Sequence, residues 1–183
     1  MRIAEFLQKF IRPSATESLQ KLWIKSLFNS ALFLLIFMIF LPMAAGWVFP
    51  VIVAVPGMPT YLPASGCLLF GFALWIACIR AFGEQGKGTP FPLDAPRELV
   101  TSGPFAIVRN PIMIAEIFVI WGEAFLISRI GVYIYAVAIM VIAHFVVRRI
   151  EEPELRKRFG SRYAEYCRSV PRWIPRISQL IRR

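Results

Sequence analysis

The chain has 183 residues, of which 57% are hydrophobic and only 17% charged, and its net charge is +10. Residues 26–79 contain no Asp, Glu, Lys, Arg or His, and a soluble domain cannot hide such a run because each surface helix needs a polar face. These features exclude a disordered chain, a disulfide scaffold and a two-domain soluble enzyme. They predict an all-α polytopic membrane protein with about four transmembrane helices.

The N-terminal segment, residues 1–26, is predicted to be amphipathic. Apolar side chains recur at helical spacing over residues 1–12, with charged side chains between them, as in a helix that lies at a membrane interface. A signal peptide is the competing interpretation, but the apolar stretch is too short and too interrupted by charge. Residues 14–17 have the capping-box form S-x-x-E, which predicts the start of a second helix.

Two apolar stretches predict a first transmembrane hairpin over residues 27–82. Spans are expected at 27–49 and 64–82, because about 20 helical residues cross a hydrocarbon core of ~30 Å. Pro42 lies inside the first span and is expected to kink it or interrupt it locally. The stretch between the spans, residues 50–63, is rich in proline and is predicted to form a turn.

A second hairpin is predicted over residues 112–147, with spans at 112–127 and 132–147 joined by a tight turn. Before it, residues 83–111 are rich in glycine and proline and are predicted to be a cytoplasmic loop, and loops of such length are usually functional. After it, residues 148–183 are predicted to form a cytoplasmic, Arg-rich amphipathic helix and a tail.

The basic residues predict the orientation. All Lys and Arg except Arg129 lie in residues 1–25, 80–110 or 148–183, and the positive-inside rule places these segments and both termini in the cytoplasm. The expected location is therefore an integral membrane protein, in the inner or cell membrane if the chain is bacterial. Its basic segments are expected to meet anionic lipid headgroups rather than nucleic acid. The three cysteines form no ligand motif, so no metal site is expected.

The tight turn of the second hairpin should bring its two cytoplasmic ends close together, which places residues 99–111 near residues 151–166. These segments carry the pattern G-P-[FY]-x-x-[VI]-R-[HN]-P and, later, E-E-x-x-L-x-x-x-F-G-x-x-Y-x-x-Y-x-x-x-V-P. The matching residues are Gly103-Pro104-Phe105, Val108-Arg109-Asn110-Pro111, Glu151-Glu152, Leu155, Phe159-Gly160, Tyr163, Tyr166 and Val170-Pro171. This pattern resembles the isoprenylcysteine carboxyl methyltransferase-like family, integral-membrane methyltransferases that are related to phospholipid methyltransferases.

The resemblance implies methyl transfer from S-adenosylmethionine (SAM), held at the cytoplasmic ends of the last helices. An arginine can pair with a carboxylate of the cofactor or acceptor, glutamates with the cofactor's ammonium or ribose, and aromatic rings with adenine or the sulfonium. The residues expected to act in catalysis are Arg109, Asn110, Glu152 and Glu116. The residues expected to bind the cofactor are Gly103, Pro104, Phe105, Val108, Arg109, Asn110, Pro111, Glu151, Glu152, Tyr163 and Tyr166.

The acceptor, expected to be lipidic or a small molecule, and the oligomeric state stay open. Asn110 stands where the family's best-known form has His, and Met113 replaces a usual Tyr, which removes a hydroxyl. A carboxylate acceptor needs no base, whereas an amine would need one, with Glu116 or His144 as candidates. The alternatives are a phospholipid or other small-molecule methyltransferase on the same core, and an inactive membrane scaffold or small transporter subunit. In a structural interpretation, Glu151 and Glu152 pair with nearby arginines on a solvated face and Glu123 is an interfacial charge.

Overall fold

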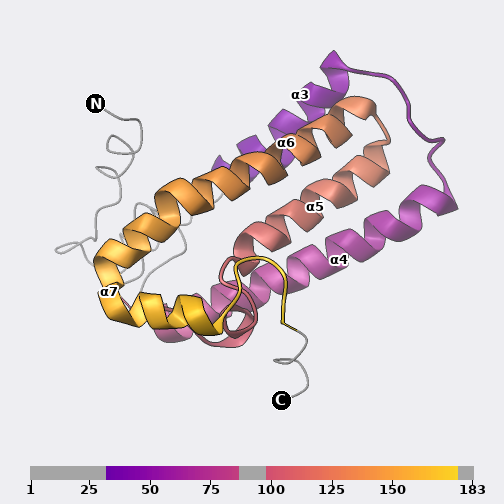
Figure 1. The fold of residues 1–183 in the computed structure, drawn as a ribbon. Coiled ribbons are helices and arrows are strands. Elements are labelled where there is room, and N and C mark those ends of the chain that lie inside the picture. Colours follow the sequence, from indigo (N-terminus) through magenta and orange to yellow (C-terminus); the bar gives the residue numbers. More distant parts are fainter. Residues whose placement is uncertain (1–31, 87–97, 177–183) are drawn as a thin grey trace, which may run out of the picture. The chain divides into compact units, whose positions relative to one another are not determined.

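A computed structural model describes residues 32–86 and 98–176, and within these ranges the chain is helical without a β-strand (Figure 1). The two helices expected in the N-terminal segment lie outside the described residues. The chain divides into two compact units. Unit 1 comprises Met1–Ser30, Ile76–Pro111 and Phe145–Arg183, and unit 2 comprises Ala31–Trp75 and Ile112–His144.

The first apolar helix runs continuously through the proline as Leu32–Val48, and the local change expected at Pro42 takes the form of a π-turn before it. It contains a π-helix, η1 (Leu35–Phe40), followed directly by α3 (Leu41–Val48), with Pro42 at the start of α3. The N–H of Leu41 bonds the carbonyl of Ile36, five residues back. Because Pro42 has no N–H and its ring crowds the carbonyl four residues back, the wider π-turn accommodates it and the helix continues.

Helix α4 (Met58–Ala81) begins earlier than expected and extends into a π-helix, η2 (Phe82–Gly86). The prediction of a turn through residue 63 and a loop from residue 83 was therefore wrong at both ends. Pro59 lies in the first turn, whose backbone N–H groups have no partner inside the helix, whereas Pro63 lies inside the helix and cannot donate to the carbonyl four residues back. The Thr60 hydroxyl also accepts a bond from the Gly57 N–H at 3.0 Å, which stabilises this start.

Helices α5 (Pro111–Ile127) and α6 (Ile130–Val146) form the second hairpin in the expected place. Ser128 adopts a positive φ of 52° in the turn between them. The turn is held to the segment after α3, since the N–H of Val53 bonds the carbonyl of Ser128 at 2.9 Å and the N–H of Ile130 bonds that of Val51 at 2.9 Å. Gly131 permits this approach, because a Cβ there would overlap the carbonyl of Ala45.

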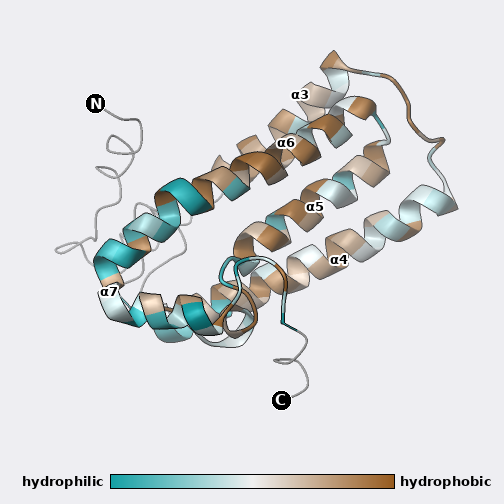
Figure 2. Ribbon diagram, in the orientation of Figure 1, coloured by the Kyte–Doolittle hydropathy of each residue, from teal (hydrophilic) through white to brown (hydrophobic). Residues whose placement is uncertain are grey.

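Helix α6 continues without a break through a π-helix, η5 (Val147–Glu151), into α7 (Glu152–Ser169). Figure 2 shows the change from mostly apolar residues in α6 to mostly polar residues in α7. Helix α7 is not one straight rod, because Gly160 has φ 54° and ψ −125° and the helix changes direction there. Only glycine adopts this conformation readily, so the sequence places the bend.

Two helical stretches among the described residues are long and apolar enough to cross a membrane, namely Met58–Gly86 and Ile130–Ser169. A third apolar stretch, Leu32–Val48, is shorter, and α5 has 17 residues. All three cysteines are free thiols, and no group of metal-binding side chains occurs in the described ranges.

Candidate functional site

The loop before α5 forms one wall of the site in unit 1. It contains a short 3-10 helix, η4 (Gly103–Ala106), which Gly103 enters with a φ of 57°. The hydroxyl of Tyr166 donates a 2.6 Å hydrogen bond to the carbonyl of Phe105, and the Phe105 ring packs edge-on against Phe82 with centroids 5.2 Å apart. The hydrogen bond joins η4 to α7 and the ring contact joins it to η2, so the two predicted motif segments do lie side by side.

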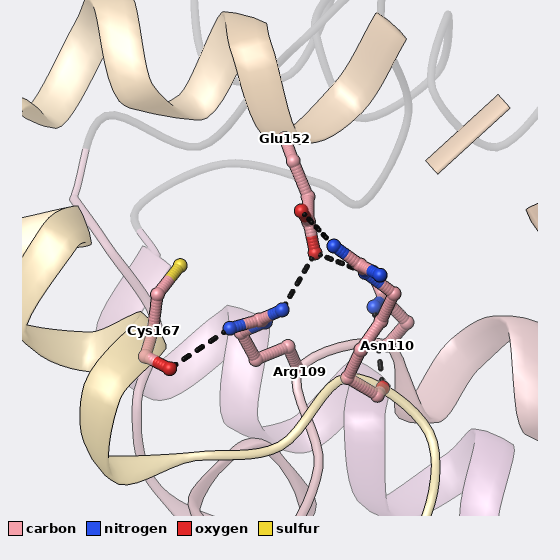
Figure 3. A network of polar contacts seen from close by, with 5 residues as sticks. Arg109, Asn110, Glu152 and Cys167 are labelled. Carbon is pink, nitrogen blue, oxygen red and sulfur yellow. Dashed lines mark hydrogen bonds and ion pairs between the residues drawn. The ribbon is translucent and has the colours of Figure 1, made fainter. Parts of the chain in front are cut away.

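A buried cluster of three charged side chains joins the same segments (Figure 3). Glu152, the first residue of α7, accepts a 3.0 Å bond from Nη2 of Arg109 at Oε1. Arg172 binds the same carboxylate through two donors, Nε to Oε1 and Nη2 to Oε2, both at 2.7 Å. The side chains of Glu152 and Arg109 are 9% and 11% exposed, against 29% for Arg172. The cluster is therefore largely shielded from water.

The two adjacent glutamates have opposite electrostatics. Burial acts to raise the pKa of Glu152, but the hydrogen bonds from Arg172 and the charge of Arg109 outweigh it and hold that pKa below its ordinary value. Burial, and secondarily the charge of Glu152, raises the pKa of Glu151 to about 7. The pair thus contains one carboxylate that stays ionised and one that changes charge near neutral pH.

The tail after α7 is attached to the loop by its backbone. The N–H of Arg109 bonds the carbonyl of Pro171 at 2.9 Å, and the Asn110 side-chain amide donates to the carbonyl of Arg172 at 3.3 Å. Arg109 Nη1 also donates to the carbonyl of Cys167 at 3.0 Å. Asn110 therefore holds the tail in place and makes no described contact with Glu152.

An apolar cavity of about 60 Å³ adjoins the cluster, and Arg109 lies in its wall. The other lining residues are Phe82, Glu98, Leu99, Val100, Phe105, Leu155, Phe159, Tyr163 and Tyr166. Burial raises the pKa of both tyrosines, so their hydroxyls stay neutral. The cavity thus combines flat aromatic surfaces with one carboxylate and one guanidinium.

Most of the residues predicted for the site lie together in unit 1. Phe105, Arg109, Glu152, Tyr163 and Tyr166 form the cluster and the cavity wall. Gly103 and Pro104 build η4, Val108 is buried behind it, Asn110 holds the tail, Glu151 ends η5 and Pro111 begins α5. Glu116 lies on α5 within unit 2, and the structure does not place it among these residues.

Sequence reasoning missed Arg172, which binds Glu152 through more hydrogen bonds than Arg109 does. The sequence contained an indication of its role, because Arg172 follows directly after the Val170-Pro171 pair of the motif. The structural interpretation, in which Glu152 pairs on a solvated face, is wrong for this residue: its partners come from the loop and the tail, and it is buried.

Comparison with protein families decides the class of the protein. The family model for phospholipid methyltransferases matches residues 60–162, more than half of the chain. The chain belongs to this family. No curated protein matches it, and no solved structure does.

As a phospholipid methyltransferase family member, the chain is a membrane methyltransferase. The matched segment runs from the start of α4 to just beyond the bend in α7, and it contains Arg109 and Glu152. It ends before Tyr163, Tyr166 and Arg172. The residues that complete the cavity and the charged cluster therefore lie outside the matched segment.

Proposed function

We propose that the protein is a SAM-dependent methyltransferase of the isoprenylcysteine carboxyl methyltransferase-like type, which acts on a lipidic acceptor. The observation that carries the proposal is the buried cluster of Glu152 with Arg109 and Arg172 beside an aromatic cavity, in a chain of the phospholipid methyltransferase family. A buried cluster of charges next to a cavity is typical of functional sites.

The side chains of the site are chemically complementary to the groups of SAM. Nε of Arg109 is buried and has no hydrogen-bond acceptor among the described residues, so it is suited to a carboxylate such as that of the methionine tail. Glu151 and Glu152 are suited to the ammonium and ribose hydroxyls, and Phe105 and Tyr163 to adenine. Pockets that enclose a ligand of this size are larger than the present cavity, so we expect its lining side chains to separate on binding.

The chain's own residues then have to orient the reactants and exclude water. SAM, when bound, supplies a methyl group on a sulfonium and its own leaving group, so the protein needs no strong acid. The cluster fixes Arg109 and Glu152 through hydrogen bonds to loop, helix and tail, which limits their motion. The apolar wall built by Phe82, Phe105 and Leu155 keeps water away from the same space.

The family match favours a second acceptor class, the headgroup of a phospholipid. A carboxylate acceptor is already nucleophilic, whereas an amine that carries a proton must lose it first. We propose Glu116 or His144 as the base in that case. If the acceptor is an amine, Glu116→Gln or His144→Gln should abolish turnover. If the acceptor is a carboxylate, both variants should keep it.

We further propose four membrane spans, formed by Leu32–Val48, α4, α5 and α6, with both termini in the cytoplasm. The support is the distribution of basic residues: apart from Arg129, all lie in the segments assigned to the cytoplasm or, for Arg80, in the last turn of α4 beside one of them. A reporter fused after residue 183 should be active in the cytoplasm only. A non-cytoplasmic signal would contradict the orientation and leave the enzyme proposal standing.

Two measurements test the enzyme proposal. Calorimetry of the purified full chain with S-adenosylhomocysteine (SAH) should show saturable binding, and its absence up to the ligand's solubility would contradict it and favour the scaffold or transporter alternatives. Membranes incubated with tritiated-methyl SAM should yield labelled product. Label released by base as volatile methanol indicates a carboxyl methyl ester, and base-stable label in extracted lipid indicates a phospholipid acceptor.

A further inference from the structure

Arg172 occupies an unusual position for a residue in the C-terminal tail. Its guanidinium binds both oxygens of Glu152 at 2.7 Å, the geometry that fixes a carboxylate most firmly. Arg109 contributes a single 3.0 Å bond to the same group. A carboxylate held only by Arg109 could rotate about that bond, whereas the planar pair with Arg172 sets its plane.

The backbone around Arg172 is held at several points. Val170 leaves α7 in an extended conformation, is 6% exposed and packs with Tyr163 and Tyr166. The next two carbonyls accept hydrogen bonds from the backbone of Arg109 and the side chain of Asn110. Four contacts therefore attach this tail to the site: apolar packing, two hydrogen bonds to its carbonyls and the side-chain ion pair.

We propose that Arg172 is a positioning residue of the methyltransferase site, which fixes the direction in which Glu152 presents its carboxylate to the cofactor. This inference rests on the proposed function, and it assigns part of the site to the tail beyond the family-matched segment. Arg172 itself is not a catalytic residue, because its guanidinium acts through Glu152.

The proposal predicts a particular pH dependence. The charged and titratable groups around Glu152 are Arg109, Arg172, the adjacent Glu151 and Tyr163. Because the pKa of Glu152 is lowered in the folded protein, its contribution to stability is present above its ordinary pKa and is lost as the pH falls through the lowered value. Removing Arg172 brings that pKa back toward its ordinary value, so the loss should be smaller and should be complete at a higher pH.

The experiment compares the full-length protein with Arg172→Gln, Arg172→Lys and the control Arg176→Gln, which removes an exposed arginine four residues further along the tail. The first readout is the thermal midpoint of the ligand-free protein between pH 3 and pH 8. The second is SAH affinity by calorimetry. For Arg172→Gln we expect the acid-dependent loss of stability (the acid limb) to become smaller and to end at a higher pH, and the affinity to fall by about 10- to 100-fold, the effect of losing a charge-assisted hydrogen bond. Arg176→Gln should stay within about twofold of wild type, as surface substitutions do.

An unmoved acid limb, or SAH binding by Arg172→Gln within twofold of wild type, would overturn the proposal. If Arg172→Gln does not fold, Arg172→Lys decides, because lysine keeps the charge but cannot form the planar pair: weaker SAH binding supports the proposal and wild-type binding overturns it. If the wild type binds no SAH, the proposed function fails. The acid limb of the ligand-free protein then still shows whether Arg172 holds Glu152.

Discussion

Replacing Glu152 with glutamine removes the negative charge that binds the guanidinium groups of both Arg109 and Arg172. The carboxylate accepts three hydrogen bonds, two at 2.7 Å and one at 3.0 Å. Glutamine keeps one acceptor oxygen, but its NH₂ group is a donor and cannot bind the guanidinium N–H groups of Arg109 and Arg172. We therefore expect Glu152→Gln to lower the free energy of unfolding and to weaken SAH binding.

The magnitude follows from the exposure of the three side chains. Breaking a fully buried ion pair by removing one partner costs about 3–5 kcal/mol. Glu152 and Arg109 approach this limit at 9% and 11% exposed, but water solvates Arg172, which is 29% exposed, so we expect a loss of ~2–4 kcal/mol. Below the ordinary pKa of a glutamate, the wild-type carboxylate becomes protonated as well. The difference between wild type and Glu152→Gln should therefore shrink as the pH falls below about 4.

The assay is equilibrium unfolding in mixed SDS micelles at pH 7 and at pH 3.5. The control is Glu165→Gln, which makes the same chemical change at an exposed position of α7 and should cost no more than ~0.5 kcal/mol. The double variant Glu152→Gln/Arg172→Gln should lose less than the sum of the single losses, because it leaves one fewer unpaired charge. Equal losses for Glu152→Gln and Glu165→Gln, or strict additivity in the double variant, would refute the buried-cluster reasoning.

Three further predictions concern the surroundings of the cluster. Gly160→Ala should destabilise by about 1–3 kcal/mol, because an L-residue is strained at φ 54°, whereas Gly83→Ala, also in open space but without a positive φ, should be neutral or stabilising in the same unfolding assay. Glu151→Gln should stabilise the protein above pH 7 by at most about 3 kcal/mol and leave it unchanged at pH 4. The reason is that a pKa raised to about 7 means the folded state loses stability as the pH rises through that value; an equal effect at both pH values would contradict it. Asn110→Ala should speed amide hydrogen exchange at Arg109, whose N–H bonds the tail, while Asn110→His should keep exchange slow because imidazole can also donate to the Arg172 carbonyl; identical exchange in both variants would count against this role.

The sequence was informative wherever a single local signal set the structure. Helix α5 begins at Pro111 and ends just before Ser128, within one residue of the span predicted at 112–127. The closeness of Arg109 and Glu152 followed from the tight turn between α5 and α6, with no side-chain information. The paired motifs indicated the methyltransferase family, which the family match confirms.

The features that sequence reasoning missed depend on contacts between distant residues. The proline-rich stretch 50–63 predicts a turn throughout, but a proline in the first turn of a helix costs little, and α4 also continues through Pro63. Arg172 directly follows the Val170-Pro171 pair, but it is one of many basic residues in the C-terminal segment, and its role depends on its approach to Glu152. No pattern in the sequence states that Gly160 adopts a positive φ, since glycine also occurs within ordinary helices.

The choice of Glu152 over Glu151 as the carboxylate that binds Arg109 and Arg172 shows how the backbone decides between identical side chains. Ala143 and Val147 are buried one helical turn apart, so in an unbroken α-helix the next residue on that face would be residue 151. In η5, however, the N–H of Glu152 bonds the carbonyl of Val147, five residues back, and this extra residue carries Glu152 into the buried position. Pro153 follows immediately, as Pro42 follows η1 closely. In both places a wider turn accommodates a proline that cannot donate to the carbonyl four residues back, and at the second it also sets which glutamate faces Arg109.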